Sequence, residues 1–433
     1  MQKIKYFCIV KRFKYFLRSL FVLFLTLSQS PACANEIDSI CARGTDSVRI
    51  SLLTCGPGNE VYSYYGHTAI RVRGKSFYFY NRRGDFDEIR DVVINYGCFS
   101  FQQKFFILRF VFGLTDYQVG ISTYDRFIAE YTLDNRWVKE QVLQLTEKEA
   151  NAIYDAIQIN LQKENRTYRY NYFYDNCTTR ARDILIGNIN GTVNYNFNVS
   201  EEKTYRDMVH SFCTHHRWSA FGNDLLLGVG ADRPISATEQ QFLPIPLYDD
   251  FERATITAAD GSKKPLVIER NDLIIAEQPH YNDTEKTSIL SPSVLLGGLS
   301  LLLFILTCYE IKKRKLLWPI DAIVMGGTGL LGIVLLAMIF SQHPTVSCNF
   351  QILLLNPLHL VFLYPTIKQI RQNKLHFWYR IWAVMLCLFM AIGLLGIQHY
   401  AEGMLLLACP LLIRQCWILY IFSKHTKTKG KNE

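Results

Sequence analysis

Long apolar stretches are concentrated in the last third of the chain, whereas the first two thirds alternate short apolar and polar segments. Each stretch approaches the ~20 residues that a membrane-spanning helix needs, although the third is short and is interrupted by Asn356 and Pro357. The pattern therefore predicts an all-α membrane domain over residues 289–423 with five helices. The five spans are expected at residues 290–308, 318–340, 350–366, 378–398 and 404–421.

The charged residues between these stretches predict their orientation. Lys and Arg cluster after the first, third and fifth spans, and the loops at 341–349 and 399–403 contain neither. Basic loops stay on the cytoplasmic side, so the segment before the first span lies outside. We therefore expect a multi-pass protein of the bacterial inner membrane, with a periplasmic catalytic domain at 35–288 and a cytoplasmic basic tail at 424–433.

Residues 1–34 have the pattern of a secretory signal peptide. They carry six Lys and Arg and no acidic residue, and their apolar run at 20–27 is too short to span a bilayer as a helix. Ala32 and Ala34 are the small residues that a signal peptidase recognises, which favours cleavage after Ala34. A lipoprotein-type cleavage before Cys33 and a retained N-terminal anchor are the alternatives.

The net charge of +9 is distributed unevenly along the chain. Residues 35–288 carry 28 Lys and Arg against 34 Asp and Glu, whereas residues 289–433 carry 13 against 4. The large globular segment is therefore acidic, which argues against a nucleic-acid partner. An aromatic share of 14% instead suits a protein at a membrane interface.

The pattern within residues 35–288 predicts an α+β domain. Thr146 and Glu149 form a capping box ahead of apolar residues at helical spacing. Strand-like composition occurs at 48–54, 67–72, 76–80 and 92–96, and a late hairpin is expected at 266–275 after Asp260 and Gly261.

The outer segment holds several cysteines, and exported cysteines are expected to pair as disulfides, although their spacing does not define the pairs. Four of them would form two bridges and leave one thiol free. No CxxC pair or His/Cys cluster has metal-ligand spacing, so we expect neither a metal site nor a cofactor. The cysteines concerned are Cys41, Cys55, Cys98, Cys177 and Cys213, with Cys348 in an external loop.

Cys177 is the best candidate for a nucleophile. Asn176 is a favourable N-cap and Gly187 a favourable helix end, which places Cys177 in the first turn of a helix. Unpaired backbone N–H groups and the helix dipole there lower the pKa of a thiol and can stabilise an oxyanion. A lone exported cysteine is nevertheless more often half of a disulfide, so spacing alone leaves a structural role open.

His67 is the candidate base, because it follows Gly66 at the start of a predicted strand. A histidine on a strand and a cysteine at a helix start are the parts of a papain-like site, here with the histidine first. A second apolar segment, 101–114, predicts either an interfacial helix that contacts acyl chains or a buried core helix.

These residues also carry a family resemblance. Residues 51–72 (SLLTCGPGNEVYSYYGHTAIRV), 95–97 (NYG) and 175–185 (DNCTTRARDIL) resemble the Lnb-type lipoprotein N-acyltransferases of Bacteroides-type bacteria. The later segments 221–228 (FGNDLLLG) and 231–234 (ADRP), and a multi-span C-terminus, are similar as well.

The resemblance implies a periplasmic domain with a permuted papain-like fold of the NlpC/P60 type, in which Cys177 matches the nucleophile and His67 the base. The third, orienting group is left open between Asn95, Asp175 and Asn176. The implied reaction moves an acyl chain from a phospholipid donor through a Cys177 thioester to a diacylated apolipoprotein acceptor at the bilayer.

Two alternatives remain at this point. One is a periplasmic thiol amidase or peptidase that acts on the cell wall. The other is a non-enzymatic membrane receptor or assembly factor in which all the cysteines form disulfides.

Overall fold

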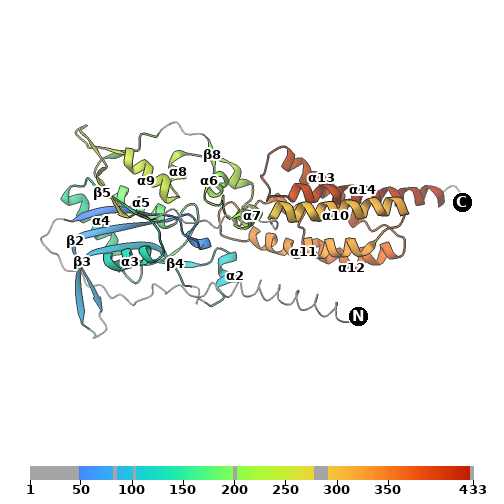
Figure 1. Cartoon of the computed structure of the whole chain (residues 1–433), viewed down its shortest axis with the longest axis horizontal. Helices are drawn as coiled ribbons and strands as arrows, with labels where there is room; N and C mark the ends of the chain where they lie inside the picture. Colours follow the sequence, from blue (N-terminus) through green and yellow to red (C-terminus); the bar gives the residue numbers. More distant parts are fainter. Residues whose placement is uncertain (1–47, 81–84, 101–103, 198–201, 277–290, 430–433) are drawn as a thin grey trace.

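The computed structural model describes residues 48–80, 85–100, 104–197, 202–276 and 291–429. In this part of the chain an α/β domain, called here the outer domain, lies at one end of an elongated molecule, and a helical bundle lies at the other (Figure 1). The expected signal peptide at 1–34 and Cys41 fall outside the described residues.

An antiparallel sheet forms the frame of the outer domain. Its seven strands are, in spatial order, β12 (Val267–Ile274), β5 (Val138–Leu143), β1 (Arg49–Cys55), β2 (His67–Tyr80), β3 (Phe86–Cys98), β4 (Asp116–Thr123) and β6 (Thr167–Arg169).

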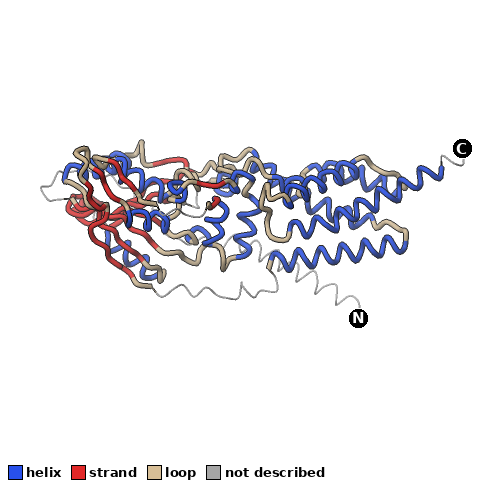
Figure 2. The backbone as a smooth tube through the Cα atoms, turned by 90° about the horizontal axis from the view of Figure 1, so that it is seen from above, coloured by secondary structure: helices blue, strands red, loops and turns tan. Residues whose placement is uncertain are grey.

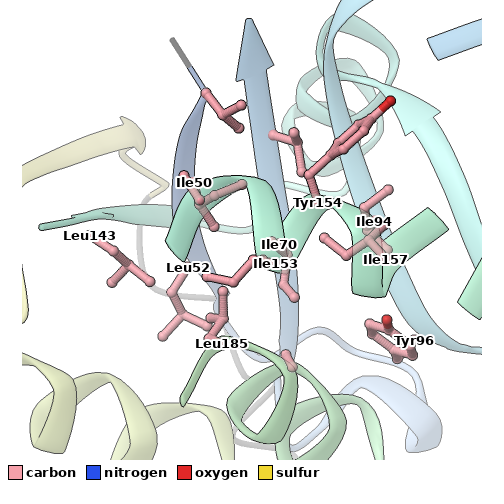
Figure 3. Packing of buried hydrophobic residues seen from close by; sticks show 14 of the residues in the cluster. Ile50, Leu52, Ile70, Ile94, Tyr96, Leu143, Ile153, Tyr154, Ile157 and Leu185 are labelled. Atoms are coloured by element: carbon pink, nitrogen blue, oxygen red, sulfur yellow. The ribbon is translucent and has the colours of Figure 1, made fainter. Parts of the chain in front are cut away.

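Both faces of the sheet are apolar because successive side chains of a strand point to opposite sides. Leu52 and Ile70 belong to the core on one face, whereas Leu53 and Ala69 belong to the core on the other. Figure 3 shows the first face packing against Ile153 of the neighbouring helix. The helices on this face are α4 (Glu147–Leu161), α5 (Cys177–Gly187) and α9 (Pro244–Arg253), and α3 (Tyr124–Leu133) lies on the other face.

The predicted capping box is present at the start of α4. The Thr146 hydroxyl accepts a hydrogen bond from the Glu149 N–H (3.3 Å), and the Glu149 carboxylate accepts one from the Thr146 N–H (2.7 Å). The apolar positions that follow at helical spacing are buried, so this prediction is confirmed.

Two strand predictions need correction. Residues 67–80 form one strand, β2, which bulges between Arg73 and Phe77 instead of breaking. The turn at Asp260 and Gly261 joins β10 (Thr255–Thr257) to β11 (Lys263–Pro265), so the hairpin lies earlier than expected. The residues after it, β12, pair with β5 of the main sheet, a long-range partner that a local pattern does not reveal.

Short elements complete the outer domain and connect it to the bundle. They are η1 (Val61–Ser63), α2 (Phe106–Val111), β7 (Thr192–Asn194), β8 (Lys203–Thr204), α6 (Tyr205–Phe212), α7 (Arg217–Leu226), η2 (Val229–Asp232), β9 (Pro234–Ile235) and α8 (Ala237–Gln240).

The bundle consists of long apolar helices, drawn in blue at the C-terminal end of Figure 2. Its elements are α10 (Pro292–Lys313), α11 (Trp318–Ile339), η3 (Phe350–Leu353), α12 (Leu358–Arg371), α13 (Trp378–Leu394) and α14 (Met404–Lys429). Among the described residues, four segments are long and apolar enough to cross a membrane, with η3 and α12 counted together. The predicted fourth span, α13, is shorter at 17 residues.

Buried charged side chains inside the bundle are paired with one another. Arg414 of α14 donates to Asp321 of α11 (2.8 Å) and to Glu310 of α10, and all three side chains are buried. Because an unpaired charge would be very costly there, we assign this cluster a structural role in holding the three helices together.

Candidate active site

Cys177 is the first residue of α5, and Asn176 determines where this helix begins. The Asn176 Oδ1 accepts hydrogen bonds from the N–H groups of Thr178 (2.8 Å) and Thr179 (2.9 Å). The Thr179 hydroxyl accepts one from the Asn176 N–H (2.8 Å), which completes a capping box. Cys177 is thereby held at a helix start, where the residue is half-buried against the core of the outer domain.

The other end of the Asn176 side chain is also fully used. Its Nδ2 donates to the carbonyl oxygens of Tyr172 (2.8 Å) and Phe242 (2.9 Å). Asn176 therefore joins α5 to two other segments, and this side chain is not directed at His67.

His67 is held by the sheet. It is the first residue of β2 and pairs with Cys55 of β1. Gly66 precedes it with φ +78°, and a Cβ there would lie 2.5 Å from the Cys55 carbonyl oxygen. Only glycine fits this turn without strain, so the backbone delivers His67 to the strand end in one conformation.

Asn95 orients the His67 ring. Asn95 lies on β3, the strand next to β2, and its Oδ1 is 3.2 Å from the His67 Nε2. If Nε2 carries the proton, it donates to Asn95, and Nδ1 is then the ring nitrogen available to Cys177. The amide thus fixes both the orientation and the tautomer of the ring.

The Cys177 thiol and the His67 imidazole interact directly. Burial raises the pKa of the Cys177 thiol, but the positive charge and the hydrogen bond of His67 outweigh it and lower the pKa from 9.0 to about 7. Burial lowers the pKa of His67, but the charge and hydrogen bond of Cys177 outweigh it and raise the pKa above 6.5. The pair therefore favours thiolate and imidazolium, the reactive form of a cysteine nucleophile.

Close packing between α5 and the sheet holds the two groups together. The Thr68 and Thr178 hydroxyls are buried 3.1 Å apart, and the Thr68 N–H further lowers the pKa of Cys177. Gly97, at the end of β3, has φ +88°, and a Cβ there would be 3.6 Å from the Cys177 Cβ. The positive φ favours glycine at this position, and the backbone of β3 thereby passes close to Cys177.

The Asp175 carboxylate is paired with Arg180 and is not in contact with His67, so it does not have the orienting role that the sequence left open for it. Its carboxylate accepts two hydrogen bonds from the Arg180 guanidinium (2.5 and 2.8 Å). Of the candidate site residues, the structure brings Cys177, His67 and Asn95 together, whereas Asp175 and Asn176 shape the start of α5.

Fewer N–H groups of the first turn are free to stabilise an oxyanion than the sequence predicts. Those of Thr178 and Thr179 are occupied by the Asn176 cap. The N–H of Cys177, at the first helical position, has no acceptor within the helix and is the one available to an oxyanion.

The expectation of disulfide pairs is wrong for Cys55, Cys213 and Cys348, which are thiols in the structure. Cys177 is also a thiol, as a nucleophile requires. Cys55 is buried at the end of β1, and the Cys213 sulfur lies 3.4 Å from the Tyr65 hydroxyl. Each is held on a separate element. Within the described ranges, no group of three or more His, Cys, Asp and Glu residues is arranged to hold a metal ion.

Polar side chains of the bundle fix the outer domain in place. The donors are Asn349 and Gln351, at the start of η3, and Gln398, in the loop after α13. They bond to backbone carbonyl oxygens at the end of α7. The acceptors are Asp224 (2.8 Å from Gln351 Nε2), Leu225 (2.8 Å from Asn349 Nδ2) and Leu227 (3.2 Å from Gln398 Nε2). All three donors are buried, so the two parts form a well-packed junction.

These features define a membrane protein whose outer α/β domain presents a cysteine and histidine pair. Comparison with family models identifies the family: residues 43–211 match the Lnb N-terminal periplasmic domain, and residues 284–426 match the Lnb transmembrane domain. The chain belongs to the Lnb family, as its motifs indicated. Comparison with the curated proteins and with the solved structures gives no match.

Proposed function

We propose that the protein is a lipoprotein N-acyltransferase, with Cys177 as the nucleophile, His67 as the general base and Asn95 as a positioning residue. The observation that carries the proposal is the placement of Cys177, first residue of α5, against His67, first residue of β2, where the neighbouring Thr178 and Thr68 hydroxyls lie 3.1 Å apart. The direction of the Cys177 pKa shift agrees with this placement, and the domain is joined to a membrane bundle. Membership of a family with periplasmic and transmembrane Lnb domains supports a role in lipoprotein processing.

In the first half-reaction, the Cys177 thiolate attacks an ester carbonyl of a phospholipid. A C–S bond forms, the C–O ester bond breaks, and the imidazolium of His67 gives its proton to the departing alkoxide of the lysophospholipid. The Cys177 N–H is placed to stabilise the oxyanion of the tetrahedral intermediate. The product is an acyl thioester on Cys177.

In the second half-reaction, the free α-amino group of a diacylglyceryl-cysteine attacks the thioester. The neutral imidazole of His67 accepts a proton from the amine, an amide C–N bond forms, and the C–S bond breaks. Cys177 leaves as a thiolate beside the imidazolium, which restores the starting state.

We further propose that the outer domain is a permuted papain-like domain and that the bundle crosses the inner membrane five times, with α13 as the short fourth span. The proposed domain limits are 35–288 and 289–423, after a cleaved signal peptide at 1–34, with a cytoplasmic tail at 424–433. The odd number of spans places the basic tail opposite the outer domain, as its charge favours.

The test is genetic complementation in cells that lack lipoprotein N-acylation. Wild type should add a third acyl chain to a lipoprotein N-terminus, measured by mass spectrometry, whereas Cys177→Ala should add none. Cys348→Ala, which removes an exposed thiol of the bundle, is the matched control and should behave as wild type. A third chain that persists in Cys177→Ala would refute the nucleophile, and one that never appears with wild type would favour cell-wall hydrolysis or a receptor.

A further inference from the structure

Helix α2 presents large apolar side chains to the outside of the outer domain. Phe105, Leu108 and Phe110 are 66%, 58% and 48% exposed. Clustered apolar side chains of this size mark a surface that contacts a membrane or another protein. The buried core helix considered for residues 101–114 is therefore wrong for these three residues.

The surroundings of α2 identify the membrane as the contact. The end of this helix is hydrogen-bonded to the loop that follows α11: the Ser341 hydroxyl donates to the Val111 carbonyl (2.8 Å), and the Gln342 N–H donates to the Phe112 carbonyl (2.9 Å). Figure 1 shows α2 at the end of the outer domain that faces the bundle. The end of α2 is thus attached to the loop that follows α11, one of the helices long and apolar enough to cross a bilayer.

The one charged side chain of α2 does not interrupt this apolar face. The Arg109 guanidinium donates to the Asp116 carboxylate (2.7 Å), and Asp116 also pairs with Arg169 (3.0 Å). Arg109 is thereby directed to the sheet, and the cluster of two guanidinium groups and one carboxylate suits a helix at the level of the lipid headgroups.

A row of aromatic rings leads from α2 to the catalytic cysteine. This aromatic row consists of Phe106, Phe99, Tyr117 and Tyr170, with ring-centroid distances of 6.0, 4.9 and 4.1 Å between successive members. Its last ring, Tyr170, and Cys177 both lie beside Gly97: a Cβ on Gly97 would be 3.8 Å from the Tyr170 ring and 3.6 Å from the Cys177 Cβ. Three of the four rings are half-buried, and Phe99 and Tyr170 pack against the core cluster that contains Tyr117, so the row lies at the edge of this core.

We infer that α2 inserts into the outer leaflet and that the aromatic row binds one acyl chain of the phospholipid donor, with its carbonyl end at Cys177. The inference rests on the proposed function and names the binding site for the first substrate. Ring faces and edges provide a continuous apolar contact for a flexible hydrocarbon chain. The row ends at Gly97, next to Cys177, which is where the ester carbonyl of a bound chain would have to lie.

The test measures how strongly the enzyme prefers a long acyl chain. Full-length protein is incubated without acceptor with dipalmitoyl or dihexanoyl phosphatidylethanolamine, and the acyl thioester on Cys177 is followed by intact mass. Phe99→Ala should lower the long-chain to short-chain rate ratio roughly tenfold, because contact with about two methylene groups is lost. Phe197→Ala, which removes an exposed ring beside Tyr195, is the matched control and should keep the wild-type ratio.

A wild-type ratio in Phe99→Ala would overturn the inference while leaving the proposed function intact. A wild-type protein that forms no thioester with either donor would instead refute the proposed function, and the inference with it. A second measurement does not depend on the fold of Phe99→Ala: a benzophenone side chain placed at Phe106 should crosslink to vesicle phospholipid, and one at Phe197 should not. Equal crosslinking at the two positions would also overturn the inference.

Discussion

The reactivity of Cys177 is decided by two opposing effects at one residue. Burial favours the neutral thiol, whereas the His67 imidazolium favours the thiolate, and the second effect prevails to give a pKa of about 7. The thiolate is thus formed as the pH rises through about 7. The raised pKa of His67 keeps its proton on the ring over part of this range, and that proton is lost at higher pH.

We therefore predict that alkylation of Cys177 by iodoacetamide accelerates with pH with a midpoint of about 7. In His67→Ala the imidazolium charge that favours the thiolate is gone, so the pH midpoint of Cys177 alkylation should rise to 9.0 or above. At neutral pH the rate should then fall roughly 50-fold, the ratio of the two thiolate fractions. Mass spectrometry of the Cys177 peptide measures this rate separately from the other cysteines.

The exposed thiol of Cys348 provides an internal control, because its alkylation should be the same in both proteins. Asn95→Ala should keep most of the lowered midpoint, since His67 remains, but should lose acyl transfer by roughly 100-fold because the ring is no longer oriented. Asn95→Asp retains an acceptor and should recover part of that loss. If Cys177 alkylation in His67→Ala still had a pH midpoint near 7, the interaction between Cys177 and His67 would be contradicted.

The sequence identified some members of the site and not others for a physical reason. Cys177 and His67 carry local signals, namely a helix cap and a glycine before a strand. Asn95 carries no local signal, because it contacts His67 only through the pairing of β2 with β3, and the two residues are 28 positions apart in the chain. Asp175 and Asn176 were equally eligible until their partners were known.

At the scale of elements, the site depends on where α5 begins. The Asn176 amide satisfies two N–H groups of the first turn and two carbonyl oxygens of neighbouring segments, and it is buried. The N–H groups of the first turn of a helix have no hydrogen-bond acceptor within the helix. One side chain therefore sets the register of α5 and links it to the rest of the outer domain.

Asn176→Ala should consequently destabilise the outer domain by about 2 kcal/mol, from the lost cap and the buried carbonyls left without donors. The change is measured as a lower thermal midpoint of the full-length protein in detergent. Asn176→Asp keeps the side-chain acceptor but not the donors, so its thermal midpoint should lie between those of wild type and Asn176→Ala. Asp175→Ala, which removes only a partly exposed ion pair, should have a small effect. An Asn176→Ala protein as stable as wild type would contradict this role.

Elements with local signals were predicted better than elements defined by distant contacts. The capping box of Thr146 and Glu149 marked α4 correctly because both partners lie within one turn. The placement of β12 beside β5 was missed because more than a hundred residues separate the two strands. The exposure of α2 likewise depends on the loop after α11, which a local apolar pattern cannot reveal.

At the scale of the whole molecule, the outer domain is seated on the bundle by polar contacts at the end of α7. Carbonyl groups at a helix end need external donors, and here Asn349, Gln351 and Gln398 of the bundle provide them. The membrane region and the outer domain were both marked by composition in the sequence. The way in which the outer domain packs on the bundle could not be predicted from composition, because it depends on side chains from segments far apart in the chain.

Gly228 lies at the closest approach of the two parts. Its N–H donates to the Thr345 carbonyl (2.8 Å), and the next N–H, from Val229, donates to the Cys348 carbonyl (2.9 Å). A Cβ on Gly228 would overlap the Cys348 carbonyl oxygen and lie 2.9 Å from that of Thr345. Because both neighbours are backbone atoms, neither can rotate away, and a side chain here must shift the outer domain relative to the bundle.

We predict that Gly228→Ala separates two activities that wild type combines. Cys177 should still react with iodoacetamide with a midpoint of about 7, because the site lies within the outer domain. Acylation of Cys177 from phospholipid vesicles should fall by roughly 100-fold, as a shift of about 1 Å suffices to disturb a reaction between positioned groups. Gly222→Ala, on α7 with no atom within 4 Å of the added Cβ, is the control and should retain both activities. Wild-type acylation in Gly228→Ala would mean that delivery of the lipid does not depend on how the outer domain is seated.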